Sequence, residues 1–73
     1  MDKTIYTKEH RLLVKKLIQA RREARLTQNE VAKKLNKTQS YVSKLESGQR
    51  RIDIVQIKEL AAIYKKSPKK FVD

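Results

Sequence analysis

The 73-residue chain has no cysteine, one glycine and one proline. Without cysteine it can form neither disulfide bonds nor a cysteine-ligated zinc site. No apolar run approaches the ~18 residues that a membrane span needs, and Met1 is followed by Asp2 and Lys3 rather than by the apolar segment of a signal peptide. The sequence therefore favours a cytoplasmic protein that does not act at a membrane.

Groups that could carry out catalysis are also scarce. The chain contains no glycine-rich phosphate loop and no cluster of carboxylates, and its one histidine, His10, has no partner at a usable spacing. We expect His10 to be a surface residue. The sequence predicts no enzymatic activity, no metal site, no cofactor and no small-molecule ligand.

Acidic residues are few compared with basic ones. Eight Asp and Glu stand against 19 Lys and Arg, which gives a formal net charge of +11, and the basic residues are spread along the chain rather than gathered in one patch. With 38% hydrophobic residues the chain can nevertheless fold, as one small domain. A folded domain with this charge is expected to bind a polyanion.

The scarcity of glycine and proline predicts an all-α domain. We expect residues 1–7 to form a flexible N-terminal arm and residues 8–73 a single folded domain. The first helix should cover about residues 8–24, with Thr7 as its N-cap. Its apolar stripe follows the helical period and consists of Leu13, Val14, Leu17, Ile18, Ala20 and Ala24.

Two short helices follow, over residues 28–35 and 39–47. Thr27 and Glu30 have the spacing of a capping box for the first of them, and Thr38 is an N-cap for the second. Between them Asn36 stands where left-handed backbone dihedrals are often needed, and Asn tolerates these well. This plan matches a helix-turn-helix, in which the first helix braces the second.

The rest of the chain continues as helices. Gly48 ends the third helix, Asp53 caps the fourth, and Ser67 before Pro68 has the pattern of a fifth helix start, which would contain Phe71 and Val72. The fourth helix has the clearest apolar stripe, formed by Ile54, Ile57, Leu60, Ala61 and Tyr64.

Outward-facing polar residues on the third helix are the candidate readers of DNA bases. Val42 and Leu45 should pack inward, which leaves Gln39, Ser40, Ser43 and Lys44 outward. An amide such as that of Gln39 can pair with N6 and N7 of adenine in the major groove, and a lysine favours O6 and N7 of guanine.

The stretch from Leu26-Thr27-Gln28 to Leu45-Glu46-Ser47-Gly48 strongly resembles the phage-repressor-type helix-turn-helix family, also called the XRE family. The resemblance covers roughly residues 15–72. It implies a compact five-helix lambda-repressor-like domain with the helix-turn-helix at helices 2 and 3, which binds DNA operators as a homodimer. It also implies a bacterial or phage protein, associated with the nucleoid when bound. The chain departs from the family's usual glycines at Asn36 and Lys65.

The resemblance also implies roles for individual residues. Gln28 would bind a phosphate and brace Gln39, and Arg21 would form a partly buried ion pair with Glu46 near the DNA backbone. The loop of residues 48–51 would hold phosphates. The expected phosphate-contacting residues are Arg21, Thr27, Gln28, Tyr41, Ser47, Arg50 and Arg51.

Some placements stay open at this level. Tyr41 can either cover the helix interface or reach a phosphate with its hydroxyl. Tyr64, Phe71 and Val72 can belong to the core or can form an apolar patch, where the resemblance places a dimer contact.

The function we expect is that of a sequence-specific transcriptional regulator that binds double-stranded DNA. Repression is favoured over activation because so small a chain has little surface left for recruiting polymerase. The alternative is an antitoxin or antirepressor, a module whose main ligand is another protein. A membrane-surface role for the basic first helix is disfavoured because folding buries its apolar stripe.

Overall fold

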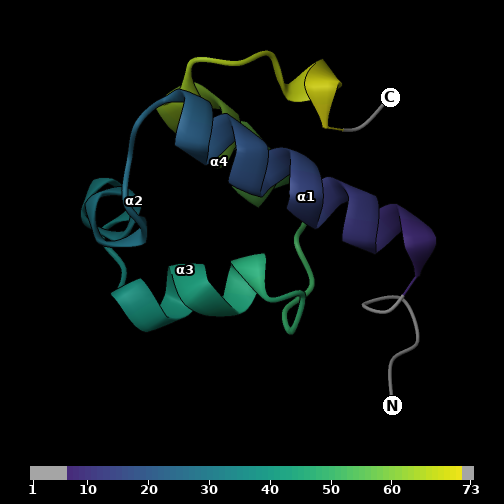
Figure 1. Ribbon diagram of the computed structural model, residues 1–73, viewed down its shortest axis with the longest axis horizontal. Helices are drawn as coiled ribbons and strands as arrows, with labels where there is room; N and C mark the ends of the chain where they lie inside the picture. The colour runs from purple at the N-terminus through teal and green to yellow at the C-terminus, as the bar shows by residue number, and fades with distance from the viewer. Residues whose placement is uncertain (1–6, 72–73) are drawn as a thin grey trace.

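The computed structural model describes residues 7–71 of the protein (Figure 1). Within this range the expected all-helical architecture is confirmed, with no strand. Four α-helices are present rather than five: the predicted fifth is a single turn of 3-10 helix, which Phe71 follows. Its hydrogen bonds run from the N–H of Lys70 to the carbonyl of Ser67 and from the N–H of Phe71 to that of Pro68, a spacing of three residues. The elements are α1 (Lys8–Glu23), α2 (Gln28–Leu35), α3 (Gln39–Glu46), α4 (Ile54–Tyr64) and η2 (Pro68–Lys70).

Every α-helix begins at the N-cap that the sequence predicts. Thr7, Thr27, Thr38 and Asp53 each accept a hydrogen bond from the backbone N–H three residues later. Because Thr7 caps α1, it belongs to the folded domain rather than to the predicted arm; the other residues of that arm, 1–6, lie outside the described range.

A residue with left-handed backbone dihedrals follows the last residue of each α-helix by one or two positions. The φ angles are 60° at Arg25, 59° at Asn36, 81° at Gly48 and 58° at Lys65. At each of the four ends two backbone N–H groups bond back to carbonyls of the last turn, the arrangement of a Schellman motif. Lys65 therefore takes a geometry that favours glycine, and Arg25 takes it without any signal in the sequence.

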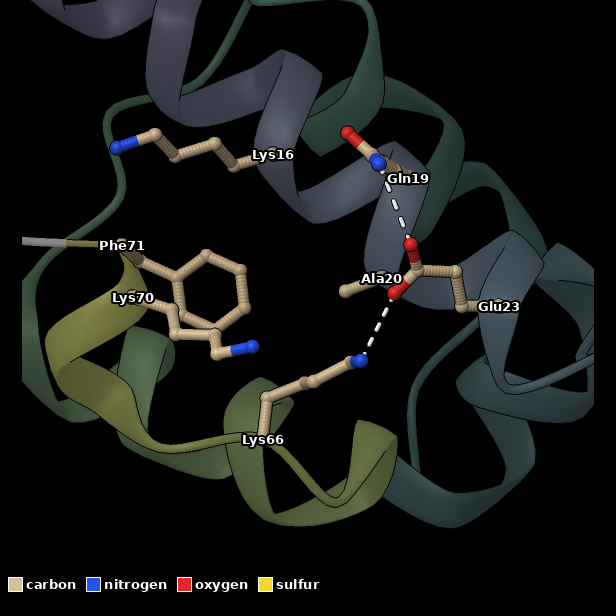
Figure 2. Close-up of a pocket in the computed structure, with 7 residues that line it drawn as sticks. All are labelled: Lys16, Gln19, Ala20, Glu23, Lys66, Lys70 and Phe71. Atoms are coloured by element: carbon tan, nitrogen blue, oxygen red, sulfur yellow. Dashed lines mark hydrogen bonds and ion pairs between the residues drawn. The ribbon is translucent and has the colours of Figure 1, made fainter.

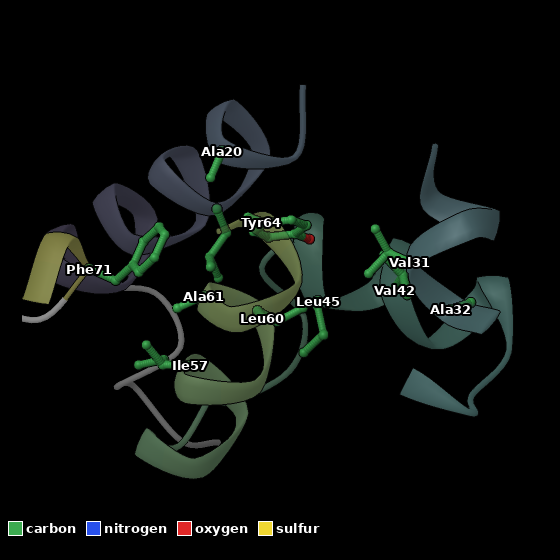
Figure 3. Close-up of a cluster of buried hydrophobic side chains, with 11 residues drawn as sticks. Ala20, Val31, Ala32, Val42, Leu45, Ile57, Leu60, Ala61, Tyr64 and Phe71 are labelled. Atoms are coloured by element: carbon green, nitrogen blue, oxygen red, sulfur yellow. The ribbon is translucent and has the colours of Figure 1, made fainter. Parts of the chain in front are cut away.

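The core joins all four α-helices, with α2 packed against α3 at one end (Figure 3). Val31 and Val42, 0% and 1% exposed, meet where these two helices pack, and the small side chain of Ala32 is buried there as well. The full cluster consists of Leu17, Ala20, Val31, Ala32, Val42, Leu45, Ile57, Leu60, Ala61, Tyr64 and Phe71.

The helices place α3 at the edge of the molecule. In Figure 1, α1 and α4 overlap in the upper half, η2 lies above them, and α3 lies along the lower edge, with α2 seen end-on beside it. Helix α3 packs on α2 and α1 through its buried residues Val42 and Leu45. Its opposite face is therefore open to solvent.

Candidate nucleic-acid interface

The open face of α3 carries the polar residues predicted to read bases. Gln39, Ser40 and Lys44 are exposed, and Ser43 is half-buried. The helical period separates this face from the buried Val42 and Leu45. The predicted base-contacting residues are thus brought together on one surface.

Gln39 is the outer end of a hydrogen-bonded chain that crosses three helices. Its Nε2 donates to Oε1 of Gln28 at 2.7 Å, and Nε2 of Gln28 donates to Oε1 of Glu46 at 2.9 Å. Glu46 also accepts hydrogen bonds from Nε and Nη2 of Arg21, at 2.7 and 3.1 Å. The predicted contact between Arg21 and Glu46 is therefore a two-pronged ion pair that joins α1 to α3.

This ion pair is largely shielded from solvent. The side chains of Arg21 and Glu46 are 14% and 8% exposed, and Nη1 of Arg21 donates to the carbonyl of Leu26 at 2.8 Å. The hydrogen bonds to Glu46 raise the pKa of Arg21, against the opposite effect of burial. Three N–H groups of Arg21 are thus used in contacts within the domain. Its predicted contact with a DNA phosphate would have to use the two N–H groups that remain.

The charge on Glu46 sets the direction of the whole chain. A carboxylate only accepts hydrogen bonds, so Gln28 turns its amide nitrogen to Glu46 and its oxygen to Gln39. Gln39 must then turn its nitrogen to Gln28. Its oxygen and its second N–H are left on the exposed face as one acceptor and one donor, the pattern that pairs with adenine in the major groove.

The predicted phosphate-contacting residues lie around this face. Thr27, Ser47, Arg50 and Arg51 are exposed, at the start of α2 and in the segment that follows α3. The hydroxyl of Thr27 accepts from the N–H of Glu30, and that of Ser47 donates to the carbonyl of Lys44 at 3.0 Å. Both hydroxyls are therefore held in place by the backbone.

Tyr41 takes the first of the two placements that the sequence left open, at the helix interface. It is half-buried and packs against the core, and its hydroxyl accepts a hydrogen bond from Nε2 of Gln56 at 2.5 Å. Gln56, on α4, was not selected from the sequence. The signal for it was present, because Asp53 and Gln56 have the spacing of a capping box, which the structure forms.

Two of the three residues predicted to form a dimer contact are instead buried in the core. Tyr64 and Phe71 are 3% and 7% exposed and belong to the core of the single chain, so neither offers a surface to a partner. Burial raises the pKa of the Tyr64 hydroxyl, and the neighbouring charge of Glu46 adds to the effect. Val72, the third residue of the prediction, lies outside the described range.

A pocket of about 260 Å³ lies between α1 and η2 (Figure 2), and no residue of α3 lines it. The ring of Phe71 faces into it beside Ala20. At its edge Glu23 accepts hydrogen bonds from Lys66 at 2.8 Å and from Gln19 at 3.2 Å, and the contact with Lys66 lowers the pKa of Glu23. Phe71 therefore serves to seat η2 against α1. The remaining lining residues are Lys16 and Lys70.

His10 differs from the surface position expected for it. The residue is half-buried, and among residues 7–71 its buried Nε2 has no hydrogen-bond partner.

Within residues 7–71 no group of three His, Cys, Asp or Glu residues could hold a metal ion. None of the helices described is long and apolar enough to cross a membrane.

Comparison with known proteins identifies a family for this chain. A family model described as helix-turn-helix matches residues 17–71, which include α2, α3 and α4 and every residue of the hydrogen-bonded chain that ends at Gln39. No curated protein matches the sequence.

Proposed function

Because the chain belongs to the XRE-type helix-turn-helix family of DNA-binding transcription regulators, we propose that it is a repressor that binds its operator as a homodimer. In this proposal α3 enters the major groove of a roughly palindromic site. The two copies of α3 lie about 34 Å apart, on one face of the duplex. Occupying the operator is by itself enough to block polymerase.

The observation that carries the proposal is the fixed amide of Gln39. The chain from Arg21 through Glu46 and Gln28 holds this amide with one acceptor and one donor exposed. A side chain fixed before binding loses less conformational entropy when it pairs with a base. We assign Gln39 to an adenine and Lys44 to a guanine, with Ser40 and Ser43 beside them.

Contacts with the DNA backbone would supply most of the affinity. Thr27, Gln28 and Ser47, together with Arg50 and Arg51, lie around the α3 face and are assigned to phosphates. If each subunit neutralises about four phosphates, the logarithm of the association constant should fall with the logarithm of salt concentration at a slope of about −7.

The homodimer needs a contact surface other than Tyr64 and Phe71. Ile54 and Val55 at the start of α4 are 48% and 61% exposed, which is unusual for such large apolar side chains side by side. We assign the dimer contact to this pair.

Selection of bound sequences from a pool of random duplex DNA tests the function. We expect enrichment of a motif with two-fold symmetry and half-sites about one helical turn apart. Enrichment without symmetry would contradict the homodimer. Failure to enrich any sequence would contradict base reading and favour the antitoxin-type alternative, a protein ligand.

Two variants test the assignment of roles. Gln39→Ala should cost ~1–3 kcal/mol on the selected operator and relax the preference at one base pair, whereas Arg51→Ala should weaken binding to operator and random DNA alike. Measuring Kd for both DNAs separates the two effects. Equal losses on both DNAs for both variants would contradict the assignment.

A further inference from the structure

Two basic side chains converge on the ring of Tyr41. Nζ of Lys37, in the turn before α3, lies 5.4 Å from the ring centroid, and Cζ of Arg50, in the segment after α3, lies 4.8 Å from it. Both distances are those of cation–π contacts. Among the residues that the structure describes, neither Lys37 nor Arg50 forms an ion pair with a carboxylate. Within residues 7–71, two positive charges are thus held close together without a paired carboxylate.

The hydroxyl of Tyr41 lies on the same ring, and its polarity is set by α4. The backbone N–H of Asp53 can only donate, and it donates to Oε1 of Gln56 at 2.9 Å, so Nε2 of Gln56 must face the other way. That nitrogen donates to the oxygen of Tyr41. The hydroxyl hydrogen therefore points elsewhere, and within residues 7–71 no acceptor receives it. Lys37 and Arg50 cannot accept it, since both carry only donors.

We propose that Lys37, Tyr41 and Arg50 form one binding site for a phosphodiester group of the DNA backbone, with Gln56 as the positioning residue that keeps the Tyr41 hydroxyl a donor. The inference rests on the proposed DNA binding. All three groups offer hydrogen to a ligand and none of them offers an acceptor, which fits the oxygens of a phosphate. The site lacks the mixed donor and acceptor pattern that distinguishes one base pair from another, so it adds affinity on any sequence.

The ring of Tyr41 restrains the side chains of Lys37 and Arg50 before any ligand binds. Lysine and arginine side chains lose much rotational freedom when they bind a phosphate. Stacking on one ring that is itself packed against the core restrains both cations beforehand. The arrangement also ties the turn before α3 to the segment after it, at the two ends of the helix that faces the DNA.

Two variants remove the proposed hydroxyl contact without removing the ring. Tyr41→Phe keeps both cation contacts and deletes the hydroxyl. Gln56→Glu keeps the capping box, since glutamate also accepts from the N–H of Asp53, but its carboxylate can only accept and so recaptures the hydroxyl hydrogen of Tyr41. We expect each variant to weaken binding about 3- to 10-fold on operator and random DNA alike, with the thermal midpoint little changed.

The charge introduced by Gln56→Glu needs its own control. Ala62→Glu adds the same charge at an exposed position of the same helix, outside the residues assigned to DNA or to the dimer contact. In the Tyr41→Phe background no hydroxyl remains to be reoriented, so Gln56→Glu should then cost only as much as Ala62→Glu does. A Gln56→Glu effect that is equally large with Tyr41 and with the Phe variant would overturn the positioning role.

Replacing single phosphates of the operator with neutral methylphosphonates locates the contact. At one phosphate in each half-site, the methylphosphonate should remove the difference in Kd between the unaltered protein and Tyr41→Phe. If Tyr41→Phe lowers the thermal midpoint strongly, Lys37→Gln tests the same site, because Lys37 is exposed. The loss of DNA affinity caused by Lys37→Gln should then disappear when the same phosphate is replaced.

Failure of this inference differs from failure of the proposed function. If the unaltered protein binds no DNA, the proposed function is wrong. If it binds its operator while Tyr41→Phe, Gln56→Glu and Lys37→Gln all bind as tightly as the unaltered protein, DNA binding stands and the phosphate site is wrong. A loss confined to the operator would also overturn the site, since it would indicate base reading.

Discussion

At the scale of the residue, Glu46 has the largest influence on the candidate interface. Its two oxygens accept from Arg21 and from Gln28, and its negative charge forces the direction of every hydrogen bond out to Gln39. A single carboxylate thus links the packing of α1 on α3 to the exposed amide. Stability and sequence preference are therefore expected to change together when it is altered.

Replacing Glu46 with glutamine tests this link. The amide offers one oxygen in place of two and leaves the charge of Arg21 unbalanced, so we expect a loss of about 1.5–3 kcal/mol in the free energy of unfolding. The ratio of operator to random-DNA affinity should also fall, because Gln28 and Gln39 are no longer fixed in one direction. Urea unfolding and paired Kd measurements give the two quantities.

Glu59→Gln, at an exposed position of α4, is the matched control and should stay within about 0.5 kcal/mol of the unaltered protein. An unfolding free energy for Glu46→Gln equal to that of this control would show that the ion pair contributes nothing.

At the scale of the element, the helix ends carry strain that their starts do not. The four N-caps are residues well suited to their positions, whereas three of the four left-handed ends are occupied by Arg25, Asn36 and Lys65 instead of glycine. A left-handed conformation costs a residue with a Cβ atom roughly 1–2 kcal/mol. The chain therefore reaches its turns at some cost in stability.

Lys65→Gly should relieve part of this strain. Glycine takes φ near 58° without a steric penalty but costs about 0.5–1 kcal/mol in backbone entropy, so we expect a net gain of about 0.5–1 kcal/mol and a higher thermal midpoint. The same substitution at Lys58, an exposed position inside α4, has no strain to relieve and should destabilise by about 0.5–1 kcal/mol. Thermal unfolding of both variants measures the difference, and changes of the same sign would refute the interpretation.

At the scale of the whole molecule, the core and the candidate interface meet at Tyr64. Its ring lies in the cluster that joins the helices, and the charges of Glu46 and Arg21 lie close enough to act on its hydroxyl. In so small a domain one core residue contributes noticeably to the total stability. Its ionisation is therefore coupled to the folding of the entire chain.

This coupling predicts unfolding at alkaline pH. Burial raises the pKa of Tyr64 above the ordinary value of 10, so below pH 10 the residue is neutral in both states and its stabilisation is complete. Above pH 10 the unfolded chain releases the proton and the folded chain keeps it. Stability should then fall by up to about 1.4 kcal/mol for each pH unit, as measured by urea unfolding.

Tyr64→Phe should weaken this pH dependence. Tyrosinate absorbance provides a second measurement, because one of the three tyrosines should ionise only as the protein unfolds. A Tyr64→Phe variant with an unchanged alkaline slope would show that the effect belongs to other groups.

Local features of this protein follow from its sequence alone. Each N-cap acts on a backbone group three residues away, and the apolar stripes follow the helical period, so the starts of α1 to α4 and the outward face of α3 were predictable. The turn at Asn36 was predictable for the same reason. The pair formed by Arg21 and Glu46 spans 25 residues and came from the family resemblance, not from local spacing.

Tertiary structure decided what depends on contacts between distant segments. The contact of Gln56 with Tyr41, the burial of Tyr64 and Phe71 and the left-handed Arg25 have no local signal that fixes them. Whether an aromatic side chain faces the core or a partner depends on which helices close over it, and which way an amide points depends on the charge at the far end of its hydrogen bonds. Short-range spacing determined the helices, and the packing of helices against one another determined the chemistry that their surfaces offer to DNA.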